Sequence, residues 1–332
     1  MNKKEIFSFA FLALFGIIIF YISGLVGILE FILSLCIYSL VFFTLHIIWT
    51  YLRKKESMDI SSFLKKFLSS MASIIFLLVF ILGGFAYYNN EIEPAPMPNI
   101  TLSNGEKTII FQAMSHVGTR SFYDKVINDI KERKTNGYVY FFEGVQGGTE
   151  ENTQKFDKAI GIKFDKNLYK NFSKLYGVVY QDNNEFLGHI NDLDFNVDLT
   201  IDEIIERYEE GGVEETSTTP PMDVNEEILN TLAELNDRQL KVLVYINQAI
   251  LNFLIKSDGL RDVITEHVGN AKLFDVILNK RNEVLSSAII KSEYDEIYVT
   301  YGLLHFEGVL KLLQEDDNTW KEIERFNYFP IQ

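Results

Sequence analysis

The sequence contains a single cysteine, Cys36, which lies inside an apolar stretch near the amino terminus. A disulfide framework and a zinc site built from several cysteines are therefore excluded, and so is a thiol nucleophile in the rest of the chain. The sequence also lacks the Gly-x-Ser-x-Gly segment of serine hydrolases, a phosphate-binding glycine loop and a His-Glu-x-x-His helix. Any chemistry must therefore use other side chains.

Basic residues are scarce after residue 88. The chain has 31 Lys and Arg against 46 Asp and Glu. Seven of the basic and four of the acidic residues lie in residues 1–88, which leaves 24 basic and 42 acidic residues, a net charge of −18, for residues 89–332. Such a surface repels nucleic acid, which we therefore exclude as a partner, and its composition indicates one water-soluble domain.

Three uncharged stretches precede this acidic part, at residues 6–29, 31–52 and 67–90. Each exceeds the roughly 20 residues that a helix needs to cross a bilayer. We therefore predict a membrane domain at 1–88 with three transmembrane helices. The first two stretches are separated only by Glu30, so we expect the turn between them at residues 23–27, where two glycines permit a tight helical hairpin.

The positions of the basic residues predict the orientation of the chain in the membrane. Lys3 and Lys4 precede the first stretch, five more basic residues lie in the 52–66 loop, and the expected hairpin tip has none. The amino terminus is therefore expected in the cytoplasm, and three crossings place the acidic domain outside it, in a periplasmic or extracellular position. The acidic, proline-spaced run at 89–106 is expected to form a semi-rigid stalk.

Residues 107–332 have the pattern of an α/β domain with a mainly parallel sheet and a helical insertion. The run at 107–112 indicates a strand, 121–134 has the apolar spacing of a helix, and 138–142 is an aromatic and β-branched run typical of a strand covered on both faces. Further strands are expected at 177–180 and 296–300, helices at 201–210 (capped by Thr200), 224–256, 258–292 and 307–314, a mobile loop at 211–222, and a helical segment over 223–293.

Two histidines follow expected strands in the same way. Residues 109–116 and 298–305 each read as a strand, a small residue, two further residues and then His116 or His305. Glu143 follows the strand at 138–142 in a similar manner. Because ligands bind beyond the carboxyl ends of parallel strands, these side chains are expected to converge there. They suit either a divalent metal with open coordination positions or an acid and base for hydrolysis.

The remaining candidates have structural interpretations. A lone histidine after a strand is usually a hydrogen-bonded structural residue, which is the alternative for His116 and His305 taken singly. His189 and His267 do not follow a strand in this pattern, and we interpret them as surface or structural residues. Asp192, Asp194 and Asp198 have a calcium-like spacing but lack the glycine and final glutamate of an EF-hand loop. We interpret these three as turn and helix-capping residues.

Four segments resemble the TraB/PrgY/GumN family, which includes the TIKI Wnt-cleaving proteins and belongs to a wider group with erythromycin-esterase-like and ChaN-like folds. The family is described by two Gly-x-x-His motifs with a glutamate and an arginine between them. The matching segments are 113–119 (Ala-Met-Ser-His-Val-Gly-Thr), 142–144 (Phe-Glu-Gly), 280–283 (Lys-Arg-Asn-Glu) and 302–308 (Gly-Leu-Leu-His-Phe-Glu-Gly). The resemblance spans about residues 105–325 and rests on order and spacing.

The resemblance implies a metal-dependent, peptidase-like site. His116 and His305 would bind a divalent metal ion such as manganese, cobalt or zinc, and Glu143 would be a further ligand or the general base. Arg281 would hold a developing oxyanion or a substrate carboxylate, although Asn282 is an alternative inward residue for contacting the substrate. The implied function is a membrane-anchored hydrolase that acts on peptides or proteins outside the cytoplasm.

One position departs from the family pattern, because Ala113 stands where the family has glycine. Alanine disfavours only a positive φ, so the loop can survive, but this difference leaves one alternative open. It is a non-catalytic peptide- or pheromone-binding module, since some family members are implicated in inhibiting peptide-pheromone signalling. The erythromycin-esterase-like resemblance leaves open another alternative, a metal-free, esterase-like hydrolase in which His116 or His305 and Glu143 serve as acid and base.

Overall fold

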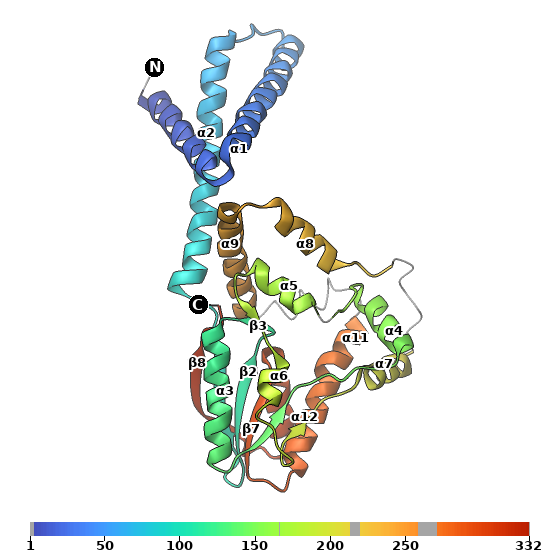
Figure 1. Ribbon diagram of the computed structural model, residues 1–332. Helices are drawn as coiled ribbons and strands as arrows, with labels where there is room; N and C mark the ends of the chain where they lie inside the picture. The colour runs from blue at the N-terminus through green and yellow to red at the C-terminus, as the bar shows by residue number, and fades with distance from the viewer. Residues whose placement is uncertain (1–2, 166, 213–219, 258–270, 332) are drawn as a thin grey trace. The chain divides into compact units, whose positions relative to one another are not determined.

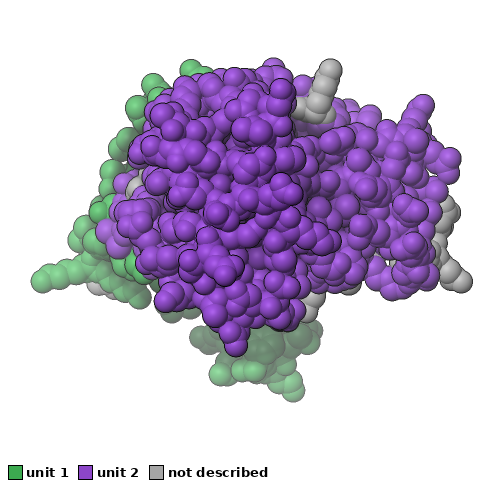
Figure 2. Space-filling model, turned by 90° about the horizontal axis from the view of Figure 1, so that it is seen from below, with its two compact units in different colours: residues 1–88, 234–246 green, residues 89–233, 247–332 purple. Residues whose placement is uncertain are grey.

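The computed structural model describes residues 3–165, 167–212, 220–257 and 271–331. The chain forms two compact units (Figure 2). The first unit comprises residues 1–88 and 234–246, and the second comprises residues 89–233 and 247–332. The first boundary coincides with the predicted end of the membrane domain, whereas the assignment of residues 234–246 to the first unit was not expected from the sequence.

The first unit contains two long apolar helices, α1 (Lys3–Leu52) and α2 (Ile60–Tyr87), rather than the three that we predicted. Both are long and apolar enough to cross a membrane. The first two predicted spans belong to one helix because the reversal needs a single non-helical residue, Gly24, with φ 69° and ψ −160°. This backbone conformation is readily available only to glycine, and it falls inside the predicted turn at 23–27.

Helix α1 doubles back on itself at this break (Figure 1). The rings of Phe15 and Phe31 meet edge to face with centroids 5.6 Å apart. In a straight helix these residues would be separated by about 24 Å along the axis. A Cβ atom added to Gly16 would lie 3.1 Å from Ile28 Cδ1, so the small residue lets the two halves of the helix approach closely.

The segment 234–246 of the first unit contacts the reversal of α1. Asn236 Nδ2 donates to the Ile22 carbonyl at 3.0 Å, and Arg238 Nη1 donates to the Tyr21 carbonyl at 2.6 Å. The Arg238 guanidinium also lies over the Tyr21 ring, 4.1 Å from its centroid. Carbonyl groups at the end of a helix have no partner inside it, so these side chains satisfy backbone groups that the reversal leaves unpaired.

The second unit is built around a six-stranded sheet with the order β6-β4-β7-β2-β1-β8. β6, β4, β7 and β2 are parallel, whereas β1 is antiparallel to both β2 and β8. The strands are β1 (Met97–Ser103), β2 (Thr108–Met114), β4 (Val139–Phe142), β6 (Phe195–Asn196), β7 (Glu296–Gly302) and β8 (Lys321–Tyr328). The prediction of an α/β fold with a mainly parallel sheet is confirmed.

Two strands lie where the sequence analysis expected none. β1 occupies part of the predicted 89–106 stalk. It pairs with β2 on one side and β8 on the other, and most of its residues are buried. β8 follows the last predicted helix and forms an edge of the sheet, where most of its side chains are exposed. Its alternating charged residues gave no apolar strand pattern, and the prolines before and within β1 favoured the stalk interpretation. Pairing with neighbours distant in the sequence decided both elements.

Helices cover the sheet and complete the core. Apolar side chains of α3, α12 and α13 share one core with those of β2, β4 and β7. The helical elements after residue 88 are η1 (Tyr88–Ile92, π), α3 (Arg120–Thr135), α4 (Glu150–Ile160), α5 (Leu168–Leu175), α6 (Asn183–Leu187), α7 (Ile201–Glu210), α8 (Val224–Glu234), α9 (Asp237–Lys256), α11 (Ala271–Asp275), η2 (Val276–Lys280, π), α12 (Arg281–Lys291), η3 (Leu303–His305, 3-10) and α13 (Phe306–Asp316).

Several predicted boundaries can be compared directly. Thr200 caps α7 as expected, in a capping box with Glu203. The strand expected at 177–180 is the short β5 (Val179–Tyr180), which pairs with β3 (Val117–Gly118) in a separate two-stranded sheet. Most of the loop predicted at 211–222, and the first part of the helix predicted at 258–292, lie outside the described residues.

Candidate active site

Neighbouring parallel strands bring the two predicted histidines and Glu143 to one edge of the sheet. β4 ends directly before Glu143, whose backbone N–H donates to the Thr300 carbonyl of β7 at 3.0 Å. β7 leads through η3 to His305, and β2 ends shortly before His116. These strands lie in the order β4-β7-β2, so their carboxyl ends share one edge. The site residues therefore lie where the strand pattern predicted them.

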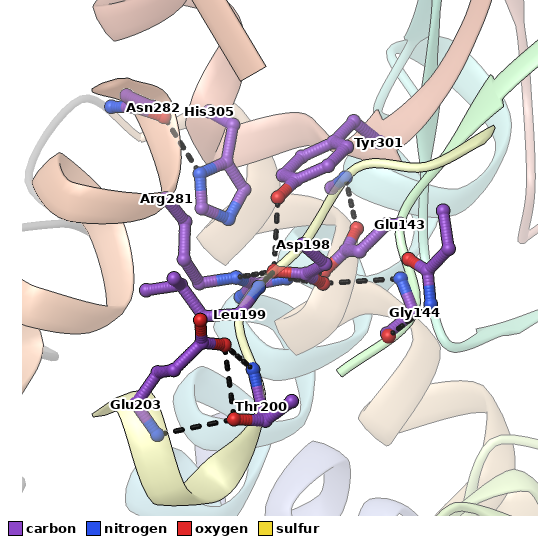
Figure 3. Close-up of polar contacts among 12 residues, drawn as sticks. Glu143, Gly144, Asp198, Leu199, Thr200, Glu203, Arg281, Asn282, Tyr301 and His305 are labelled. Atoms are coloured by element: carbon purple, nitrogen blue, oxygen red, sulfur yellow. Dashed lines mark hydrogen bonds and ion pairs between the residues drawn. The ribbon is translucent and has the colours of Figure 1, made fainter. Parts of the chain in front are cut away.

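Arg281 links two carboxylates at the centre of this site (Figure 3). Its Nη2 donates to Glu143 Oε1 at 2.6 Å and to Asp198 Oδ2 at 2.8 Å, while its Nε donates to Asp198 Oδ1 at 2.7 Å. The Arg281 side chain is 6% exposed, that of Asp198 is fully buried, and that of Glu143 is 17% exposed. Buried charges are tolerated only when paired, so the three side chains form one interdependent cluster.

One nitrogen of Arg281 remains available for a substrate. The hydrogen bonds of Arg281 use Nε and Nη2, and Nη1 makes none with the described part of the chain. Nη1 also reaches solvent, because among the described buried side-chain polar atoms only the Tyr298 hydroxyl lacks a partner. The guanidinium therefore presents a fixed donor to the outside of the cluster. It sits at the start of α12, directly after the π-helical segment η2, a feature often found at functional sites.

Asp198 is a central site residue whose main role the sequence analysis missed. Besides the two bonds from Arg281, its carboxylate accepts from the Tyr301 hydroxyl at 3.1 Å, the Gly144 N–H at 3.0 Å and the Leu199 N–H at 2.8 Å. It thereby joins the loop after β4, the end of β7 and the start of α12. Its position after β6, another parallel strand, was the available signal.

The other aspartates of the predicted turn have different surroundings. Asp194 is buried in an ion pair with Lys134 and accepts from the Tyr140 N–H at 3.1 Å. Asp192 is exposed. The structural interpretation therefore suits Asp192 and Asp194, whereas Asp198 belongs to the buried cluster with Arg281 and Glu143.

Glu143 is held from both sides. Its Oε1 accepts from Arg281, and its Oε2 accepts from the Gly302 N–H at 2.5 Å. A Cβ atom added to Gly302 would lie 3.3 Å from Glu143 Oε2 and 3.4 Å from His305 Cδ2, so glycine lets the backbone approach both side chains closely. Ala113, by contrast, lies in the extended backbone of β2, where no positive φ is required. Its departure from the family glycine therefore introduces no backbone strain.

His305 and Asn282 form a buried pair. His305 Nδ1 lies 2.7 Å from Asn282 Oδ1, and the His305 ring meets the Tyr301 ring edge to face at 4.8 Å. An amide oxygen that accepts from Nδ1 fixes the orientation and tautomer of the ring. Gly308 makes room for this pair, because a Cβ atom there would lie 2.1 Å from Asn282 Nδ2. Asn282, predicted to contact substrate, is thus placed to position His305.

His116 has a different environment from His305. It is exposed to solvent, whereas His305 is buried. The His116 ring stacks on the Tyr169 ring of α5, with centroids 4.2 Å apart and an angle of 28° between the planes. The described residues make no hydrogen bond to the His116 ring nitrogens. The two histidines are therefore not equivalent, and His116 is the one presented to an incoming ligand.

The charges of the cluster shift the pKa values of its members. Burial favours a higher pKa for Glu143, but the Arg281 guanidinium and the neighbouring His116 and His305 outweigh burial and lower it. Burial likewise acts to lower the pKa of Arg281, and the neighbouring Glu143 and Asp198 reverse this and raise it. Although the His116 ring reaches solvent, its mostly protein surroundings lower its pKa, against the opposing effect of Glu143. At neutral pH, Glu143 is therefore charged and His116 is neutral.

The predicted metal ligands do not fit a shared ion in this arrangement. Within the described part of the chain, no three His, Cys, Asp or Glu side chains are placed to hold one metal ion. Both oxygens of Glu143 are engaged, by Arg281 and by the Gly302 N–H. A guanidinium fixed on this carboxylate repels a second cation. A manganese, cobalt or zinc ion held by His116, Glu143 and His305 therefore stays a prediction from the sequence.

No protein-family model, curated protein or solved structure matches this chain. The resemblance to the TraB/PrgY/GumN family therefore rests on the residues and their order alone.

Proposed function

We propose that this chain is a membrane-anchored hydrolase that cleaves peptides or proteins outside the cytoplasm. The observation that carries this proposal is the buried cluster of Glu143, Arg281 and Asp198 at the strand ends, whose charges act on the solvent-exposed His116. Buried ion clusters contribute little net stability compared with apolar packing, and groups with shifted pKa values concentrate at functional sites. A role in catalysis therefore explains the cluster better than a contribution to the stability of the fold does.

In the proposed reaction, the neutral His116 ring accepts a proton from water as the water oxygen attacks the substrate carbonyl carbon. The electron pair of the carbonyl double bond moves onto its oxygen, and Arg281 Nη1 donates a hydrogen bond to this oxyanion. The His116 imidazolium then returns its proton to the leaving nitrogen as the carbon–nitrogen bond breaks. No metal ion is needed for these steps.

Glu143 supports this reaction through its charge. Its lowered pKa makes it a weak base at neutral pH, so proton transfer is assigned to His116. The carboxylate stabilises the imidazolium that forms on His116, and it fixes Arg281 together with Asp198. His305, oriented by Asn282, lies close enough to Glu143 to influence its pKa.

We infer a distant relationship to the TraB/PrgY/GumN family. One observation supports this relationship. Four residues that are widely separated in the sequence lie close together at one edge of the sheet: His116, Glu143, Arg281 and His305. The assignment of peptides as the substrate class follows from this resemblance. The peptide-binding alternative drew on Ala113, whose extended conformation in β2 leaves the site geometry intact, so we favour the hydrolase.

We further propose that the second unit lies outside the cytoplasm. A straight helix with the 50 residues of α1 would be about 75 Å long, more than twice the roughly 30 Å hydrocarbon core, so the reversal at Gly24 returns the chain across the membrane. The halves 3–23 and 25–52, followed by α2, then carry the chain across three times.

The test uses the full-length protein in detergent and fluorescein-labelled denatured casein. We expect the wild-type chain to release labelled fragments and Glu143→Gln to lose at least about 100-fold in rate. Glu150→Gln is the matched control, because Glu150 is an exposed glutamate in the first turn of α4. Equal rates for the wild type and Glu143→Gln would sink the proposal, and retained casein binding without cleavage would favour the binding module.

A further inference from the structure

The His116 ring has only one close ring neighbour among the described residues, Tyr169 of α5. The two rings stack with centroids 4.2 Å apart. An exposed imidazole with no hydrogen bond to the described chain would otherwise rotate freely. The Tyr169 ring therefore limits the directions in which the His116 nitrogens face.

The Tyr169 hydroxyl lies close enough to Glu143 and Arg281 for their charges to act on it. It makes no hydrogen bond with the described residues, and it is not among their buried unpaired atoms, so solvent reaches it. Burial of the ring raises the pKa of Tyr169, and the nearby Glu143 charge raises it further, against the effect of Arg281. The hydroxyl therefore keeps its proton at neutral pH and remains a hydrogen-bond donor.

Helix α5, which carries Tyr169, is held at its carboxyl end. The carbonyls of Leu175 and Tyr176 accept from Asn247 Nδ2 at 3.2 Å and Gln248 Nε2 at 2.8 Å. These bonds satisfy carbonyl groups at the carboxyl end of α5, which lack partners inside the helix. A helix fixed in this way holds Tyr169 as a rigid part of the site.

We propose that Tyr169 is a further substrate-contacting residue of this active site. Its hydroxyl donates a hydrogen bond to the substrate carbonyl oxygen beside Arg281 Nη1, and its ring orients His116. The proton stays on the hydroxyl throughout, so the two donors share the charge of the oxyanion without transferring a proton to it. This inference rests on the proposed hydrolase function and adds a residue that the family motifs do not include.

The test compares Tyr169→Phe, Tyr169→Leu and the control Tyr176→Phe in the full-length protein with labelled casein. Tyr169→Phe keeps the ring but loses the donor, so kcat should fall about 100-fold while KM and Tm stay near the wild-type values. Tyr169→Leu also loses the stacking on His116, so kcat should fall further. Tyr176→Phe removes a hydroxyl at the end of the same helix and should leave both constants unchanged.

Wild-type kcat and KM for Tyr169→Phe would overturn the inference, even if Glu143→Gln is inactive and the hydrolase function holds. If the wild-type chain cleaves nothing, the proposed function fails. The binding of peptides to the immobilised protein then tests whether Tyr169 contacts them. In that case a casein digest is passed over immobilised wild-type and Tyr169→Phe chains. Loss of the retained peptides from the variant supports substrate contact by the hydroxyl, whereas identical retention refutes it.

Discussion

The guanidinium nitrogen Nη2 of Arg281 lies 2.6 Å from Oε1 of Glu143, two residues that are 138 positions apart in the sequence. Glu143 directly follows the parallel strand β4, and Arg281 is the first residue of α12, a helix that packs against the sheet. Their contact therefore depends on the complete fold of the second unit. It also places a cation where the sequence alone suggested a metal ion.

Removing the cation should destabilise the fold. Arg281→Leu leaves the carboxylates of Glu143 and Asp198 next to each other without compensation, and we expect a loss of about 3–5 kcal/mol in the free energy of unfolding. Thermal or urea unfolding of the full-length protein measures the change. Arg120→Leu is the control, because the solvent-accessible ion pairs of Arg120 with Asp124 and Glu185 should each contribute at most about 1 kcal/mol. An equally stable Arg281→Leu variant would contradict the proposed interdependence.

Activity should decline only in acid. The pKa of His116 is lowered from its ordinary value of 6.5, so the ring is neutral, and able to accept a proton, at and above that pH. We therefore expect kcat/KM to be constant near neutrality and to fall as the pH drops through the lowered pKa, below 6.5. A pH–rate profile measures this limb. A decline that begins above pH 6.5 would assign the base to another group.

Chelators should leave the activity unchanged. Because Arg281 and the Gly302 N–H occupy the oxygens of Glu143, we expect the purified full-length protein to hold no stoichiometric manganese, cobalt or zinc. Metal analysis by mass spectrometry is made beside a folded His116→Ala/His305→Ala variant. Near-stoichiometric metal that disappears in the double variant would instead establish the ion that the family resemblance implies, and Arg281 would then have to release Glu143.

The two positions of the repeated small-x-x-His pattern should respond differently to substitution. Gly302→Ala places a methyl group 3.3 Å from Glu143 Oε2 and should reduce kcat at least about 10-fold by shifting this carboxylate. Ala113→Gly restores the family glycine but lies in extended strand, so activity should be unchanged and stability reduced by about 0.5–1 kcal/mol. Higher activity in Ala113→Gly would show that the alanine impairs the site.

The membrane topology is open to a direct test with reporter fusions. A reporter joined after residue 332 should be active outside the cytoplasm and silent inside it, because the basic residues of the 52–66 segment favour the cytoplasmic side. A truncated fusion within that segment is the matched control and should give the opposite result. Activity of the full-length fusion inside the cell would place the second unit, and its substrates, in the cytoplasm.

Local patterns in the sequence determined the elements that carry the site. Long uncharged stretches predicted the apolar character of the amino-terminal part, although the structure has two long helices there and not the predicted three, and the aromatic run at 138–142 predicted β4. Thr200 predicted the start of α7. These predictions succeeded because hydropathy, side-chain period and helix capping act over a few neighbouring residues.

Tertiary structure alone decided which of these residues act together. Asp198 carried the local signal of a turn residue, but contacts with Arg281 and Tyr301 make it a buried centre of the site. β1 likewise became a strand through pairing with β2 and β8, despite its prolines. A residue's own neighbours in the sequence set its conformation, whereas the charge opposite a buried carboxylate is set by chain segments that only the completed fold brings together.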